Sequence, residues 1–70
     1  MNKQATAKQK SRSELETESE ASRLITQVES ALALVASRTP DENHELETTA
    51  DRIERAARDL ADALRRLAHE

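Results

Sequence analysis

The residues of this chain that could do chemistry are fourteen carboxylates and two histidines, and the chain contains no cysteine. Enzymes need such groups to converge in a pocket, as a nucleophile beside a base or as carboxylates held in different surroundings. Here the carboxylates are spread among eleven Lys and Arg residues. Thiolate catalysis and cysteine-based zinc sites are excluded. We therefore expect no enzyme, no catalytic residue and no cofactor.

The two histidines, His44 and His69, are the remaining candidates for a metal site. An antiparallel partner chain would bring His44 of one copy toward His69 of the other. Zinc sites use three or four protein ligands, and no cysteine is present to complete the set. We predict exposed histidines near helix ends and no metal site.

The elements that must position these residues are predicted to be helices. The chain has no glycine, no aromatic residue and one proline, so the usual material of sheets and tight turns is missing. Ser13 and Glu16 have the spacing of a capping box, which predicts a helix over about residues 13–38. The preceding residues 1–12 are basic and lack apolar periodicity, which indicates a disordered arm.

The turn between two helices is predicted at Thr39, because Pro40 suits the first position of a helix and Glu42 completes a second capping box. A second helix should then cover about residues 40–69. The two helices are of similar length and suit an antiparallel hairpin. The alternative is one long helix that Pro40 kinks, within a parallel coiled coil.

Both predicted helices carry apolar stripes. In the second helix the steps alternate between four and three residues, as in a heptad repeat, with large and small side chains alternating. Its seam consists of Leu46, Ala50, Ile53, Ala57, Leu60, Leu64 and Leu67. The first helix has a wider stripe, from which we assign Leu24, Val28, Ala31 and Val35 to the same core.

Association is expected because the chain is short and has only twelve Leu, Ile and Val residues. Chains of this size usually need a disulfide, a metal or a partner to be stable. The predicted fold class is therefore all-α: a two-helix antiparallel hairpin that dimerises into a four-helix bundle. The expected partners are a second copy and an unidentified protein target.

The heptads of residues 46–67 resemble those of the Rop-type plasmid proteins, whose paired helical hairpins stack small and large residues into a four-helix bundle. The resemblance covers residues 13–69 and implies a dimeric regulator that binds structured nucleic acid. In this chain the contacts would come from the basic arm, through Lys3, Lys8, Lys10 and Arg12, and from the arginines of the second helix.

Protein binding is the function that we expect first, with nucleic-acid binding as the alternative. The arginines of the second helix are spaced four residues from acids, as in Asp51 and Arg55 or Glu54 and Arg58, and should be neutralised by them. No aromatic residue is available to stack on bases. The margin of the first stripe is the candidate partner surface, with Ile25, Leu32 and Leu34. A small adaptor, inhibitor or chaperone-like accessory protein of a phage or plasmid would fit.

A cytoplasmic location is expected. The longest apolar run, Ala31 to Ala36, is far shorter than the ~20 residues that span a bilayer. The first twenty residues contain no apolar segment of the kind found in secretory signals. We therefore expect no contact with a membrane.

Overall fold

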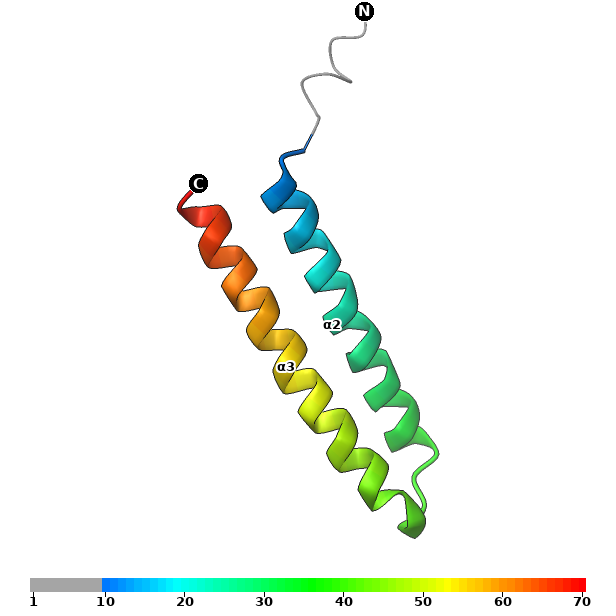
Figure 1. Cartoon of the computed structure of the whole chain (residues 1–70). Helices are drawn as coiled ribbons and strands as arrows, with labels where there is room; N and C mark the ends of the chain where they lie inside the picture. The colour runs from blue at the N-terminus through cyan, green and yellow to red at the C-terminus, as the bar shows by residue number, and fades with distance from the viewer. Residues whose placement is uncertain (1–9) are drawn as a thin grey trace, which may run out of the picture.

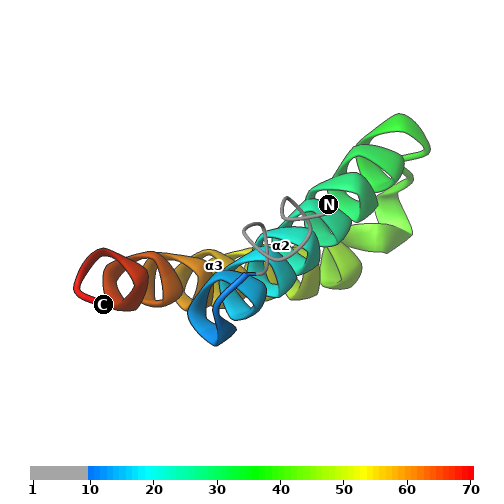
Figure 2. The same ribbon diagram turned by 90° about the horizontal axis from the view of Figure 1, so that it is seen from above.

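The computed structural model describes residues 10–70, which form two long helices joined by a short turn, without any strand. These are helix α2 (Arg12–Ala36), the 3₁₀ turn η1 (Pro40–Glu42) and helix α3 (Asn43–Ala68). Figure 1 shows α2 and α3 side by side and antiparallel, with the start of α2 near the end of α3. From above, these two helices make one layer (Figure 2). The predicted all-α hairpin is confirmed, and the single kinked helix is wrong.

Helix α2 begins with a capping box, but two residues earlier than predicted. The Ser11 hydroxyl oxygen accepts a hydrogen bond from the Glu14 amide at 3.1 Å, and the Glu14 carboxylate accepts one from the Ser11 amide at 2.9 Å. Ser13 and Glu16, the predicted pair, have the same spacing but lie inside the helix. The helix therefore includes Arg12, which we had placed in the disordered arm. Lys10 and Ser11 of that arm precede the helix, and residues 1–9 lie outside the described residues.

Helix α2 ends at Ala36, two residues before the predicted end at Arg38. The amide and the hydroxyl of Ser37 both donate to the Ala33 carbonyl, at 3.1 and 3.0 Å. Helices commonly end on a left-handed residue, usually glycine. No residue in the range 10–70 has a positive φ, so α2 ends without such a cap, and the Arg38 amide donates to the Val35 carbonyl at 3.4 Å.

The turn follows the predicted chemistry at Thr39 and Pro40. The Thr39 amide donates to the Glu42 carboxylate at 3.2 Å, and the Glu42 amide donates to the Thr39 carbonyl at 3.1 Å. Pro40 has no amide hydrogen to leave unpaired and occupies the first position of η1. Helix α3 then continues to Ala68, with Arg65 and Arg66 in its last turn, where cations stabilise the helix dipole.

The two helices meet along one row of residues on each. On α3 the least exposed side chains recur at steps of three and four: Leu46, Thr49, Ile53, Ala56, Leu60, Ala63 and Leu67. The matching half-buried row on α2 is Ser13, Thr17, Glu20, Leu24, Gln27, Ala31 and Leu34. The Thr17 hydroxyl donates to the Ser13 carbonyl of its own helix at 2.8 Å and lies 3.5 Å from the Ala63 carbonyl of α3. This contact marks the register of the hairpin.

The small residues in this interface differ from those of the predicted seam. Thr49, Ala56 and Ala63 contact α2, whereas Ala50, Ala57 and Leu64, one position later in each heptad, are exposed. Both sets continue the heptad that Leu46, Ile53, Leu60 and Leu67 define. The set used in the hairpin has small side chains throughout, so the helices can approach evenly along their length.

Candidate functional site

One face of the hairpin is apolar and unpartnered. Two right-handed helices that lie antiparallel have a common geometric rule. On both helices, the residue one position after an interface residue points to the same side of the pair. Applied to the two interface rows, this rule gathers ten aliphatic residues, which we call the apolar face, together with four glutamates. The aliphatic residues are Ala21, Ile25, Val28, Leu32, Val35, Ala50, Ala57, Ala61, Leu64 and Ala68, and the glutamates are Glu14, Glu18, Glu47 and Glu54.

The large side chains of the apolar face are substantially exposed. Leu32 and Val35 are each 66% exposed, Leu64 is 50% exposed, and Val28 is 43% exposed. Isolated exposed aliphatics are common, but a row of them along one face marks an interaction surface. Five of the six large exposed aliphatics of residues 10–70 lie on this face, and the sixth, Leu15, does not.

The predicted core residues of α2 are divided between the hairpin interface and the apolar face. Leu24 and Ala31 are half-buried against α3, whereas Val28 and Val35 are exposed on the apolar face. Of the three candidate partner-binding residues, Ile25 and Leu32 are exposed on the apolar face. Leu34 is half-buried in the interface row instead, so the structure separates it from the other two.

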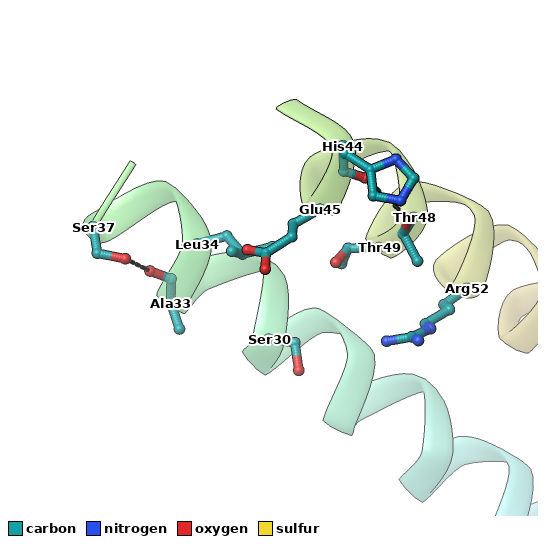
Figure 3. Close-up of a pocket in the computed structure, with 9 residues that line it drawn as sticks. All are labelled: Ser30, Ala33, Leu34, Ser37, His44, Glu45, Thr48, Thr49 and Arg52. Atoms are coloured by element: carbon teal, nitrogen blue, oxygen red, sulfur yellow. Dashed lines mark hydrogen bonds between the residues drawn. The ribbon is translucent and has the colours of Figure 1, made fainter. Parts of the chain in front are cut away.

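The opposite face carries a shallow groove near the turn, with a volume of about 520 Å³ (Figure 3). It is lined by Ser30, Ala33, Leu34 and Ser37 of α2 and by His44, Glu45, Thr48, Thr49 and Arg52 of α3. The hydrogen bonds drawn there are local to one helix: Ser37 donates to the Ala33 carbonyl, and Thr48 donates to the His44 carbonyl at 2.9 Å. Neither bond pairs a nucleophile with a base.

The interface between the helices contains one poorly satisfied carboxylate. Oε1 of Glu20 is shielded from solvent and has no hydrogen-bond partner within residues 10–70. Its nearest cation is Arg23, whose Nη1 lies 3.5 Å away. A polar residue in this row, where an aliphatic one would pack against Ala56 and Ala63, weakens the hairpin interface.

The cations proposed to contact nucleic acid are only partly described. Lys3 and Lys8 lie outside the described residues. Lys10 forms an ion pair with Glu18, and Arg12 lies 3.6 Å from the Glu16 carboxylate. Both described cations of the arm thus have an acidic partner on α2.

The exposed charges of α3 pair differently from the prediction. Within the described part of that helix, the one ion pair joins Arg65 and Asp62 at 3.2 Å, three residues apart. The predicted pairs four residues apart, such as Asp51 with Arg55, are not within ion-pair distance. Exposed pairs of this kind contribute little to stability in either arrangement.

Residues 10–70 contain no group of three or more His, Asp or Glu side chains placed to hold a metal ion. His44 lines the groove near the turn, and His69 follows the end of α3. Neither helix of the described region is long and apolar enough to cross a membrane.

No protein-family model, curated protein or solved structure matches this chain. The likeness to Rop-type proteins therefore stays a likeness of pattern, in the heptads of α3 and in the hairpin layout. The apolar face, the groove and the charges are the features of residues 10–70 that bear on function.

Proposed function

We propose that this chain is a non-catalytic protein-interaction module, such as a small adaptor, inhibitor or chaperone-like accessory protein. The observation that carries this proposal is the exposure of Ile25, Val28, Leu32, Val35 and Leu64 on one face of the hairpin. Each such side chain contributes about 1.5–3 kcal/mol when it is fully buried. A protein surface that covers this face would recover most of that free energy.

The working unit in this proposal is a homodimer, a four-helix bundle of two hairpins. Only Thr49, Ala56 and Ala63 are buried among residues 10–70, so a single hairpin has almost no apolar core. Ile53, Leu60 and Leu67 are only half-buried because they border the apolar face. A second layer of helices would cover these residues together with Val28, Val35 and Leu64. The seam predicted from the sequence, Leu46 to Leu67, would lie in this core between the two layers, and it stays a prediction.

The target would bind at the outer margin of this unit, where Ile25 and Leu32 project from α2. Leu24 and Ala31 lie on the side of the interface row that borders the apolar face, so the residues that follow them are turned further from α3 than Val28 and Val35. Side chains at the edge of a bundle stay partly accessible after the bundle forms. An amphipathic helix of a target protein could dock on such a strip.

The test is affinity capture from the native host with the tagged full chain, followed by mass spectrometry. Leu32→Glu places a charge on the apolar face, and Ala33→Glu places the same charge one residue away, in the groove on the opposite face. We expect one target to be captured by the unmodified chain and by Ala33→Glu, and to be lost with Leu32→Glu.

Two results would contradict the proposal. Capture that survives Leu32→Glu but is lost with Ala33→Glu would move the binding site to the groove. Capture that neither variant changes would show that the apolar face is not used. Sedimentation of both variants tells whether any loss of capture follows from a loss of the dimer.

Binding of structured nucleic acid, the alternative function, has less support in the described residues. The two described cations of the proposed contact set, Lys10 and Arg12, lie beside Glu18 and Glu16. Phosphate contacts would have to displace these carboxylates. Protein binding is therefore the proposal that the charges and the apolar face support best.

A further inference from the structure

The outer strip of α2 is the part of the apolar face that stays partly accessible in the proposed dimer, and its charges bear on what can cover it. We define the strip as Ile25, Leu32 and the other residues of α2 that lie within about 60° of Ile25 around the helix, at about 100° per residue. Both aliphatic side chains are more than half exposed. By the same count Glu14, Glu18 and Glu29 belong to the strip. It therefore combines exposed aliphatic side chains with carboxylates.

Every charged side chain of the outer strip is a glutamate. Helix α2 contains two arginines, Arg12 and Arg23, and both lie about 140–160° around the helix from Ile25. Their ion-pair partners, Glu16 and Glu20, are off the strip as well. The cations of α2 therefore leave the charge of the strip uncompensated.

The α3 side of the apolar face adds no cation either. Its charged residues are Glu47 and Glu54. Arg58 and Arg65, the arginines that follow closest around that helix, lie on its back, about 180° from the hairpin interface. Among the residues of α2 and α3, the apolar face thus carries four glutamates and no lysine or arginine.

Glu29 is the carboxylate that lies closest to the exposed aliphatic side chains. It follows Ile25 by four residues and precedes Leu32 by three, and these are neighbouring positions on a helix surface. It is exposed, and no cation of residues 10–70 lies within ion-pair distance of it. A basic group of a partner that covers Ile25 and Leu32 would come beside this carboxylate.

Glu18, at the far end of the strip, already holds an ammonium group. Lys10, which precedes α2, forms an ion pair with it, and both side chains stay about half exposed. The Glu14 carboxylate is engaged differently, because it accepts the Ser11 amide of the capping box. Exposed ion pairs are weak, so a lysine or arginine of a partner can replace Lys10 at little cost.

We infer that the target segment that docks on the outer strip is a basic amphipathic helix, with aliphatic side chains on Ile25 and Leu32 and with lysine or arginine beside Glu18 and Glu29. This inference rests on the proposed protein-interaction function and specifies the chemistry of the target. Glu18 and Glu29 are about 17 Å apart along α2, so a helix of about three turns or more can contact both. Charges at the edge of an interface select among partners, and an acidic helix with the same aliphatic seam is rejected.

The test uses two synthetic helical peptides of about 21 residues, or six turns. Both carry leucine at steps of three and four residues, and the flanking positions are all lysine in one peptide and all glutamate in the other. Fluorescence anisotropy measures their binding to the full-length chain. We expect the lysine peptide to bind, more weakly as salt is added, and the glutamate peptide to bind at least about tenfold more weakly.

Two double variants locate the binding on the chain. Glu18→Gln with Glu29→Gln removes two carboxylates of the strip, and Glu16→Gln with Glu45→Gln removes the same charge from the opposite face. The first should weaken binding of the lysine peptide about fivefold, the effect of losing two exposed ion pairs, and the second should change it by less than about twofold. Circular dichroism checks that both fold, and Glu29→Gln alone replaces the first if it does not.

Three results would overturn the inference. Equal binding of the two peptides would mean that the strip selects no charge. Equal weakening by the two double variants would mean that the net charge of the chain attracts the lysine peptide. If neither peptide binds and the chain sediments as a dimer, the second copy itself covers Ile25 and Leu32. The protein-interaction function is tested separately, because capture of a target that is lost with Leu32→Glu does not depend on the charge of that target.

Discussion

At the scale of single residues, the start of α2 shows how far a sequence motif can be trusted. Ser11 with Glu14 and Ser13 with Glu16 both have the spacing of a capping box, so the sequence alone does not choose between them. The structure uses the earlier pair, and Ser13 lies half-buried in the row that faces α3. The choice depends on contacts with a helix some fifty residues away, which a local motif does not contain.

Ser11→Ala should lower the free energy of unfolding by about 0.5–2 kcal/mol, because the Glu14 amide loses its acceptor. Ser13→Ala is the matched control and should change stability by less than about 0.5 kcal/mol, since the Ser13 hydroxyl makes no hydrogen bond to any of residues 10–70. Urea unfolding followed by circular dichroism measures both. A larger loss for Ser13→Ala than for Ser11→Ala would show that the helix begins at the later serine.

At the scale of the elements, the sequence predicted the turn and the hairpin but not which rows of residues meet. The interactions of Thr39 and Pro40 involve only residues close in the sequence, so the sequence alone was enough to predict the turn. Leu46 and Ile53 are followed by small residues at both three and four positions, and Leu60 is followed by Ala63 and Leu64, so each choice continues a heptad. The stripe of α2 is wider than one helix can cover, so half of it remains exposed.

Ala56→Leu should destabilise the protein by about 1–3 kcal/mol, because the site is buried against α2 and has no room for a larger side chain. Ala33→Leu adds the same atoms to an exposed position of α2 and should be close to neutral. Thermal unfolding of both variants checks this. Equal melting temperatures for the two would mean that Ala56 does not face α2.

At the scale of the whole molecule, polarity is distributed in an unusual way. The interface inside the hairpin contains Thr17, Glu20 and Gln27, whereas the outer face of the same helix contains Val28, Leu32 and Val35. A chain that folded alone would be expected to place these residues the other way around. The proposed dimer would bury these outer aliphatic residues. The sequence predicts such an association through its length and its few large aliphatics.

A titration with mixed RNA and DNA, followed by fluorescence anisotropy, should show no binding at low salt. Four phosphate contacts by the proposed cations would give a slope of about −3.6 in a plot of log affinity against log salt. Micromolar binding with such a slope would support the alternative function. The quadruple change of Lys3, Lys8, Lys10 and Arg12 to Gln should then abolish it.

The small buried core, Thr49 with Ala56 and Ala63, has a consequence for how the amount of this protein relates to its activity. In the proposed dimer, folding and association are one reaction, and the folded fraction depends on total concentration. Below the dissociation constant most copies would be unfolded and open to proteases. Above it, each additional copy finds a partner and survives longer. The level of active protein would therefore rise more steeply than the rate of its synthesis.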